Sequence, residues 1–474
     1  MLHAYFKEGK EASVIMWDTI EDTLMDLLTQ AGELWTRFQL YLAREGRAFV
    51  RWLLTALAVG GVVGAVGAFF HHAVEWATET RIAHPWLLFC LPLAGLLIVA
   101  LYQRFHMEDD GGTEFVLESA RNARYLRLTM VPLIFISTVL THLCGGSAGR
   151  EGAALQIGGG LSAALGRLFR LDEQDERIAT MSGMAAGFSA LFGTPLSAAV
   201  FAMEVESVGL MQYSAIVPCF LSALVANIVS ARLGCPGTGF LVHGAATVTQ
   251  SSLSRLILLG ALCGMLANLF CRTMHGFQML YNRCCRQRWT KAVAGGVVVI
   301  LLTLLFGTDY NGAGMNIIAQ ALEGRTLPWA FVLKIIFTGA TLAAGYKGGE
   351  IVPSFFVGAC FGCLFAPVLG LSASFGAAVG MVSVFCGVTN SPLTSILLGY
   401  ELFQGVSVAP LALAVAVSYM LSGYTGLYHQ QEIVYSKTKT VRIDKIGTED
   451  YSGREQRGEF ARAATRRDIR THKG

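Results

Sequence analysis

The chain has 474 residues, of which 53% are hydrophobic and only 15% are charged, and its mean hydropathy is +0.51. Ordinary soluble domains carry about 25% charged residues, so this composition predicts a membrane protein. The net charge of +3 is small, and the charges cluster at the ends and in a few loops, which gives no reason to expect a nucleic-acid partner.

The N-terminal region is expected to precede the membrane domain. Its first residues, MLHAYFKEGKEA, lack an apolar signal-peptide core, which indicates a cytoplasmic N-terminus. The segment 12–45 has apolar residues near helical spacing, so we predict a cytoplasmic amphipathic helix over residues 1–46. Apolar stretches near the ~20 residues that a bilayer demands then follow at 49–70, 85–102, 128–144, 214–233, 253–275, 291–306, 330–345 and 408–422.

A second set of apolar stretches is too short or too rich in glycine to form simple spans. These are 113–122, 151–166, 178–191, 194–206, 350–371, 374–388 and 391–403. Irregular backbone at membrane depth is tolerated only where protein or a water-filled cavity surrounds it. The mixture of full spans and broken helices therefore predicts a transporter or channel with a site near the middle of the membrane.

Basic residues indicate how the chain is oriented. They gather at 37–51, at 283–291 and in the tail from Lys437 onward. By the positive-inside rule these segments face the cytoplasm, so both termini of this multi-pass protein are expected there, in the cell's inner (plasma) membrane. The polar segment 437–474 is predicted to be a flexible cytoplasmic tail without CBS domains.

The sequence contains an internal repeat. FGTPLSAAVFAMEVE (192–206) matches TNSPLTSILLGYELF (389–403), which aligns Pro195 with Pro392 and Glu204 with Glu401. Two similar halves of this kind indicate a duplication, and in transporters such halves meet at an ion site. Because Glu204 and Glu401 hold matching places, we expect them to cap or contact helices rather than to take part in transport.

Three predicted helices begin directly after glycine-rich loops, near Thr113 in DDGGTEFV, at Glu151 in GGSAGREG and at Glu350 in YKGGEIVP. A helix N-terminus has unpaired N–H groups and a partial positive charge. Several such ends aimed at one point would bind an anion without a full cation, which would hold the ion too tightly to conduct it. Glycine allows the backbone amides to approach the ion.

Glu151 places a carboxylate on one of these helix starts. The point at which these helix starts would bind an anion is called the anion seat. When ionised, Glu151 can occupy this seat and exclude a free ion, and when protonated it can leave the seat. Competition between a carboxylate and a halide for one seat predicts proton-coupled anion movement. The alternative is that Glu151 only caps a helix beside Arg150.

The motifs GREGAALQIGGG and GYKGGEIVPSFFVGACFG, together with the two Pro-Leu…Glu helices, resemble the CLC family of chloride channels and anion–proton antiporters. The resemblance runs from about residue 50 to about residue 435. It implies an all-α polytopic membrane fold, an inverted repeat of tilted and broken helices, with halves at 47–235 and 236–436. It also implies a homodimer in the lipid bilayer that transports halide ions and protons without a cofactor, nucleotide or metal.

The resemblance also assigns site residues. The gating glutamate maps onto Glu151, and Glu350 is a second candidate for proton transfer. A tyrosine hydroxyl maps onto Tyr428, with Tyr424 as a weaker match. The anion site formed by helix N-termini maps onto Gly112, Thr113, Gly149, Arg150, Gly152, Gly349 and Ile351.

The chain departs from the family's usual pattern. GGTEF replaces the usual GSGIP, Ala153 replaces a proline, and Val205 stands where the internal proton-transfer glutamate usually follows Glu204. Glu350, Tyr428 and that missing glutamate resemble the bacterial fluoride–proton antiporter branch. The methionine typical of that branch is absent near Thr113, so the sequence does not decide whether the transported halide is chloride or fluoride.

Two other functions compete with the antiporter. On the same fold the protein could be a passive voltage- or pH-gated chloride channel, in which Glu151 only gates. An intramembrane enzyme would need metal ligands or a nucleophile with a base, and the chain has no HExxH motif. It also has no GxxxxGK[ST] loop, which argues against nucleotide-driven pumping.

Overall fold

A long uninterrupted helix begins the structure because no proline breaks the chain before residue 85. A computed structural model describes residues 2–108, 111–122, 124–244, 250–404, 406–428, 431–438 and 442–447. In it α1 runs over Leu2–Ala83, so the predicted segments 12–45 and 49–70 form a single helix. It ends just before Pro85, which disfavours helical backbone at the preceding residue.

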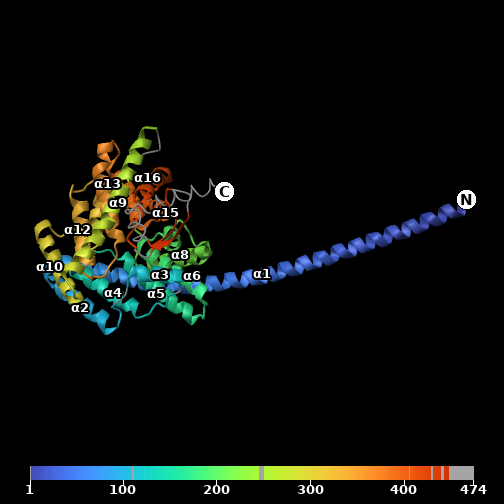
Figure 1. The fold of residues 1–474 in the computed structure, drawn as a ribbon, viewed down its shortest axis with the longest axis horizontal. Helices are drawn as coiled ribbons and strands as arrows, with labels where there is room; N and C mark the ends of the chain where they lie inside the picture. The colour runs from blue at the N-terminus through green and yellow to red at the C-terminus, as the bar shows by residue number, and fades with distance from the viewer. Residues whose placement is uncertain are drawn as a thin grey trace, which may run out of the picture. The chain divides into compact units, whose positions relative to one another are not determined.

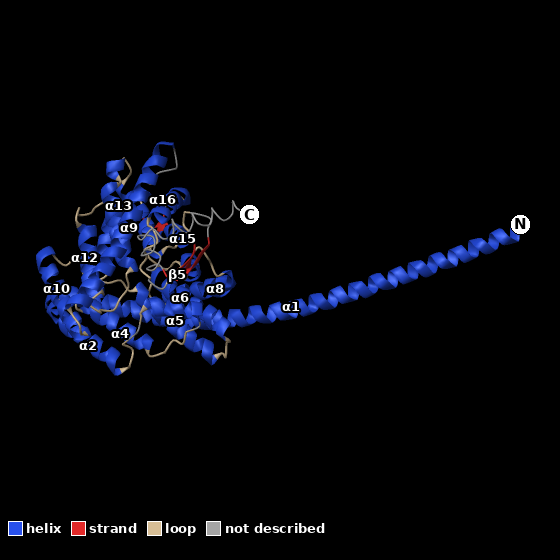
Figure 2. Cartoon of the chain, viewed as in Figure 1, coloured by secondary structure: helices blue, strands red, loops and turns tan. Residues whose placement is uncertain are grey.

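The chain divides between Leu54 and Thr55 into two compact units. In the first, α1 exposes large apolar side chains such as Leu34, Trp35 and Phe38. The second unit holds the remaining elements, which pack together (Figure 1). Helices dominate the described residues, and the strands are short (Figure 2).

The first half of the second unit follows α1 with elements close to the predicted segments. They are η1 (Pro85–Cys90), α2 (Leu91–Arg104), α3 (Thr113–Asn122), α4 (Met130–Leu143), α5 (Glu151–Leu168), α6 (Glu173–Phe192), α7 (Pro195–Glu204), β1 (Ser207–Val208), η2 (Tyr213–Ala215) and α8 (Ile216–Arg232).

The second half adds α11, which the sequence analysis did not predict. Its elements are β2 (Phe240–Leu241), α9 (Gln250–Cys284), α10 (Arg288–Phe306), α11 (Met315–Leu322), α12 (Ala330–Leu342), α13 (Ile351–Phe365), η3 (Pro367–Leu369), α14 (Ala373–Thr389), α15 (Pro392–Leu402), β3 (Phe403–Gln404), α16 (Val408–Leu421), β4 (Glu432–Tyr435) and β5 (Arg442–Gly447).

Six helical segments of the described residues are long and apolar enough to cross a membrane. They are Met25–Ala83, Pro85–Arg104, Tyr213–Arg232, Ser252–Cys284, Arg288–Phe306 and Ile351–Leu369. Five apolar helices are shorter, namely α4, α7, α12, α14 and α16. The predicted mixture of full spans and short, broken helices is therefore present.

Equivalent helix pairs in the two halves pack through glycine. In the first half α5 lies against α6, and a side chain at Gly158 would collide with the carbonyl of Gly183. In the second half α13 lies against α14, and a side chain at Gly362 would collide with the carbonyl of Gly376. Small residues let helix backbones approach closely inside a membrane, so both of these helix pairs are tightly packed.

Each of the two repeat glutamates caps a helix in the other half of the chain. Glu204 at the end of α7 accepts hydrogen bonds from the amides of Leu393 and Thr394 at the start of α15 (3.0 and 2.8 Å). Glu401 near the end of α15 accepts from the amides of Leu196 and Ser197 at the start of α7 (2.9 and 2.7 Å). The predicted structural role of this pair is confirmed, and the caps are reciprocal.

A chain of buried aromatic rings joins the halves near these caps. Phe355 of α13 contacts Phe192 of α6 and Phe385 of α14, with ring centroids 5.7 and 5.1 Å apart. Phe201 of α7 lies 5.9 Å from Phe385 and 5.1 Å from Phe188. The core therefore continues from one half into the other, as expected for phenylalanines with a packing role.

The described residues also form two small sheets. β2 pairs in parallel with β3, while β4 pairs in parallel with β1 and antiparallel with β5. The prediction of a flexible tail over 437–474 was wrong for Arg442–Gly447, because these residues form strand β5 along the free edge of β4. The ranges 439–441 and 448–474 of that predicted tail lie outside the described residues.

The reciprocal caps predict a stability effect for Glu401→Ala. The change leaves the amides of Leu196 and Ser197 without their carboxylate acceptor. Buried donors without partners cost ~1–3 kcal/mol, so the melting temperature of purified protein in detergent should fall. Glu323→Ala is the matched control, because Glu323 pairs with Arg325 at an exposed site. Equal melting temperatures for the two variants would contradict a capping role.

Candidate functional site

The two glycine-rich loops that precede α5 and α13 are joined to each other by their backbones. Gly149 donates its N–H to the carbonyl of Gly349, and Gly349 donates back to Gly149, each over 2.7 Å. This antiparallel bridge links one loop from each half of the chain. It holds the N-termini of α5 and α13 next to each other.

Glycine is required at this junction because the backbones leave no room for a side chain. A Cβ added to Gly349 would lie 2.6 Å from the amide nitrogen of Gly152. A Cβ on Gly152 would lie 3.0 Å from the hydroxyl oxygen of Thr113 and 3.1 Å from the Cα of Gly349. The glycine pattern in the sequence thus reflects the close approach of two backbones, with the Thr113 side chain packed against them.

Glu151 begins α5 with its side chain folded back over the helix start. The residue is 1% exposed, and its Oε2 accepts a hydrogen bond from the amide of Arg150 (2.9 Å). The amides of Glu151 itself and of Val352 in α13 also face this carboxylate. Its Oε1 lies 3.9 Å from Nε of Arg150. The carboxylate therefore lies among amides from both helix starts.

The third helix start, α3, meets the same place through Thr113. The Thr113 hydroxyl donates to the carbonyl of Gly152 (3.3 Å), and Nε2 of Gln156 donates to the Thr113 oxygen (3.3 Å). Gly112 precedes it with φ of +65°, a left-handed conformation that glycine adopts without strain. The three predicted helix starts are brought together at one point.

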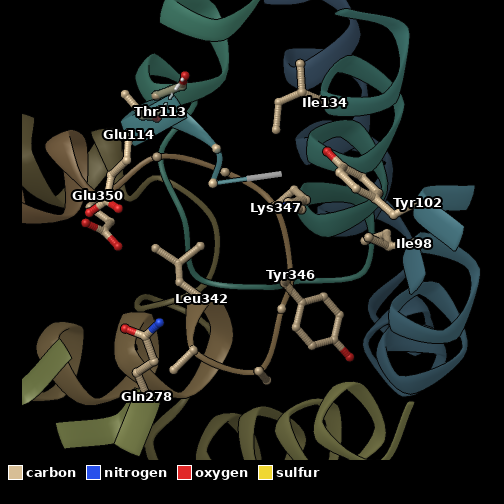
Figure 3. A pocket seen from close by; sticks show the side chains of 18 of the residues that line it. Ile98, Tyr102, Thr113, Glu114, Ile134, Gln278, Leu342, Tyr346, Lys347 and Glu350 are labelled. Atoms are coloured by element: carbon tan, nitrogen blue, oxygen red, sulfur yellow. Dashed lines mark hydrogen bonds between the residues drawn. The ribbon is translucent and has the colours of Figure 1, made fainter. Parts of the chain in front are cut away.

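A cavity of about 460 Å³ ends at these helix starts (Figure 3). Its wall includes Gly112, Thr113, Gly152, Gly349 and Tyr428 from the predicted anion site, and also Glu350. Four other predicted residues, Gly149, Arg150, Glu151 and Ile351, do not line this cavity. Instead, Gly149 forms the backbone bridge, and Glu151 and Ile351 are each 1% exposed.

The two tyrosines near the end of the membrane domain have different surroundings. Tyr428 is 5% exposed and lines the cavity. The Tyr424 hydroxyl instead lies 2.8 Å from that of Ser436 and accepts a hydrogen bond from the amide of Lys437 (2.9 Å). Tyr428 thus lies in the cavity wall and Tyr424 does not, and the part of Tyr428 in anion binding stays a prediction.

The loop before Glu350 is held by residues on either side of the cavity. The Tyr346 hydroxyl donates to the carbonyls of Leu91 and Ala292 (both 2.9 Å). The Lys347 ammonium lies 4.2 Å from the ring centroid of Tyr102, which is a cation–π distance. Both contacts fix the loop against α2 and α10 and so fix the start of α13.

A buried lysine supports the other loop, the one before Glu151. Lys334 of α12 is fully buried and donates to the hydroxyl of Ser147 (3.0 Å) and to the carbonyls of Tyr310 and Gly312 (3.0 and 2.6 Å). The sequence analysis missed it. A lone lysine in the apolar run FVLKIIF was the available signal, because an intramembrane charge is costly and needs partners.

Glu114 and Gln156 were also missed. Glu114 follows Thr113 in the first turn of α3 and lines the cavity, and Gln156 lies in α5 at 2% exposure. The available signal was the presence of a polar side chain inside each glycine-rich motif, Glu114 in GGTEF and Gln156 in GREGAALQ. The described residues contain no group of three or more His, Cys, Asp or Glu side chains that could hold a metal ion.

A cavity that ends at three helix starts inside a bundle of spanning and broken helices defines an ion-transport protein of the membrane. The family described as voltage gated chloride channel matches residues 94–423. The chain belongs to this family, the CLC chloride channels and transporters, whose members are not enzymes.

Its relatives include a protein named as a halide channel and a protein named as a proton–chloride exchanger. A protein of Pseudomonas syringae pv. tomato called chloride/fluoride channel protein is 35% identical over 396 residues, covering 82% of this chain and 87% of the relative. The H(+)/Cl(-) exchange transporter ClcA of Vibrio campbellii is 28% identical, covering 84% of this chain and 91% of the relative.

Solved structures show the same fold. A crystal structure of a CLC-type fluoride/proton antiporter superposes with a TM-score of 0.79 at 29% identity, covering 81% of this chain and 98% of that one. A slow cyanobacterial Cl⁻/H⁺ antiporter superposes with a TM-score of 0.68 at 22% identity, covering 78% and 94%. The all-helical polytopic CLC fold and halide transport in a membrane are therefore established for this chain.

The backbone bridge predicts the effect of Gly349→Ala. The new Cβ would meet the backbone of Gly152 and Glu151, and backbone atoms cannot rotate away from it. Overpacking of this kind costs ~1–3 kcal/mol, so both the melting temperature and halide affinity in calorimetry should fall. Gly276→Ala in α9 is the control, because nothing lies within 4 Å of its added Cβ. Wild-type affinity in Gly349→Ala would show that the bridge does not shape the anion seat.

Proposed function

We propose that the protein is a halide–proton antiporter in which Glu151 is the gate. The observation that carries this proposal is the position of the Glu151 carboxylate among the amides of Arg150, Glu151 and Val352. These amides come from two helix starts, where unpaired N–H groups bind anions. A carboxylate that occupies such a place is positioned to compete with a halide ion for it.

The exchange follows from that competition. Ionised Glu151 accepts the hydrogen bonds of the seat and excludes a halide. When Glu151 takes up a proton it loses its charge, the amides bind it less strongly, and a halide replaces it. Loss of that proton to the other side of the membrane returns the carboxylate and releases the halide. One proton carried in one direction is thereby linked to halide movement in the other.

We favour fluoride over chloride as the substrate. The relative with 35% identity is called a chloride/fluoride channel protein, and the structure with the TM-score of 0.79 is of a fluoride/proton antiporter. Glu350, in the cavity wall, adds a carboxyl group that can donate a strong hydrogen bond when protonated. Fluoride is the smaller halide and the stronger hydrogen-bond acceptor.

The remaining assignments follow from the resemblance and the distribution of charge. The basic segments 37–51 and 283–291 support cytoplasmic termini in the inner membrane. Arg288 and Lys291 of the second segment line the cavity, so the cavity belongs to the cytoplasmic side in this orientation. A homodimer with one pore in each subunit is part of the same proposal and rests on the resemblance to the family.

The test uses purified protein in liposomes loaded with fluoride or, separately, with chloride. One electrode follows halide efflux and a second follows external pH. Proton uptake that accompanies efflux is the expected result, and the halide that moves faster is the substrate. Halide efflux without proton movement would instead support a passive channel.

Glu151→Gln is expected to uncouple proton uptake from halide efflux. A neutral amide cannot carry a proton, so proton uptake should fall by at least ~100-fold, the usual scale for loss of a positioned acid or base. Halide efflux should persist, because the seat is no longer blocked by a charge. Glu323→Gln, at an exposed site on another loop, is the control. Proton uptake that survives in Glu151→Gln would remove this residue from the mechanism.

Glu350→Gln tests the substrate preference in the same liposomes. The substitution removes the carboxyl proton but keeps the size of the side chain, so the ratio of fluoride to chloride efflux should decrease, or coupling to protons should weaken. Size-exclusion chromatography checks that the protein stays folded. An unchanged transporter would show that Glu350 only caps α13.

A further inference from the structure

Two carboxyl groups meet at the inner end of the cavity. Glu114, in the first turn of α3, and Glu350, directly before α13, both line it. Their side chains end beside one another, pointing together (Figure 3). The two acids come from different halves of the chain, and each is only partly exposed. A pair of ionised carboxylates at such close quarters is unfavourable, which favours one shared proton.

The chain has no acid at the place where the family resemblance implies an internal proton-transfer glutamate. Val205 stands there, fully buried, and its carbonyl accepts a hydrogen bond from Nε2 of Gln431 (2.8 Å). The next residue, Glu206, is 8% exposed and does not line the cavity. Protons that reach Glu151 from the cavity side therefore need another acceptor.

A second, independent feature indicates that the cavity holds a hydrogen-bond donor. Gln156 is 2% exposed and lines the cavity, and its Oε1 has no hydrogen-bond partner among the described residues. A halide cannot satisfy a carbonyl oxygen, because both are acceptors. Water can, so the unpaired oxygen supports a water-filled end to the cavity beside Thr113 and Glu114.

Other titratable groups lie near the two acids and near Glu151. Glu350, Glu114 and Glu151 all lie near enough to the Tyr428 hydroxyl to act on it electrostatically. Cys271 of α9 lies near enough to Glu350 to interact with it electrostatically. The other charged or titratable residues of the cavity wall are Tyr102, Glu108, His275, Arg288, Lys291, Tyr346 and Lys347.

We infer that Glu114 and Glu350 act as one acid pair that takes up the transported proton from cavity water and passes it toward Glu151. This inference rests on the proposed antiport. A hydronium ion in the cavity gives its proton to a carboxylate oxygen of the pair and leaves as water. When the pair passes that proton toward the Glu151 carboxylate, two negative charges remain side by side. Their repulsion draws the next proton from the cavity.

The alternative role for Glu114 is purely structural. An acid in the first turn of a helix is stabilised by the helix dipole. That role predicts a lower melting temperature for Glu114→Gln and equal losses of halide and proton movement. A proton-transfer role predicts a selective loss of proton movement.

The experiment compares variants in liposomes loaded with fluoride, with fluoride efflux and external pH recorded together. In Glu114→Gln, proton uptake should fall by about 100-fold or more, as for loss of a positioned acid or base, while fluoride efflux continues. Glu118→Gln is the matched control, because Glu118 lies one turn further along α3 and pairs with Arg124. It should behave as wild type. Glu206→Gln tests the rival acid and should also leave proton uptake unchanged.

The double variant Glu114→Gln/Glu350→Gln tests whether the acids act as one unit. Residues that work together give non-additive losses, so the double variant should lose no more proton uptake than the worse single variant. Independent, multiplying losses would overturn the pair. Should Glu114→Gln fail to fold, Glu114→Asp withdraws the carboxyl by one methylene group and should lower proton uptake while fluoride efflux continues.

The outcomes separate this inference from the proposed function. A wild-type protein that moves fluoride without protons would overturn the antiport proposal and the acid pair with it. A coupled wild type with equal proton uptake in folded Glu114→Gln or Glu114→Asp would overturn the acid pair alone. A loss of coupling in Glu206→Gln but not in the Glu114 variants would transfer the role to Glu206.

Discussion

The pair of hydrogen bonds between Gly149 and Gly349 is the contact on which the site depends. It joins two loops that are distant in the sequence, and it brings the amides of two helix starts to one place. Each loop is in turn held from outside, one by Lys334 through Ser147 and the other by Tyr346. The backbones of these two loops meet closely and the Thr113 side chain lies against them, so a side chain added to Gly152 or Gly349 would collide with neighbouring atoms.

The same arrangement separates two kinds of chemistry at one site. Backbone amides are fixed partial charges, so they bind an anion with the same strength at any pH. The carboxyl groups of Glu151, Glu350 and Glu114 change charge with each proton. In the antiport that we propose, a seat of constant strength combined with acids of variable charge links halide movement to proton movement, and neither group alone would do so. The aromatic core around Phe355 and Phe385 packs helices of the two halves together.

Local signals in the sequence were sufficient for most of the fold. Glycine-rich loops followed by short apolar runs predicted the starts of α3 and α5 correctly, and the repeat predicted that Glu204 and Glu401 hold equivalent structural places. Helix α11 was missed because its eight residues are fewer than the stretch over which helical periodicity is recognised. Strand β5 was missed because its stability comes from β4, not from its own polar sequence.

Long-range pairings could not be predicted from one sequence. Nothing in GREG or KGGE indicates that their glycines bond to each other. Likewise, the closeness of Glu114 to Glu350 is evident only when α3 is placed beside the loop before α13. Glu151 was found because its motif is specific, and its role as the gate stays a prediction. Lys334 had a signal, a single charge in an apolar run, but its three partners lie on two separate loops.

The reciprocal caps between α7 and α15 also constrain how the chain is made. The ribosome synthesises the first half well before the second. Until α15 has been synthesised, no carboxylate accepts hydrogen bonds from the amides of Leu196 and Ser197. Unpaired backbone groups are costly in lipid. The early half must therefore keep this helix start in water, or in the insertion machinery, until its counterpart is synthesised. Each half completes the other, so the duplicated sequence gives a single folding unit rather than two.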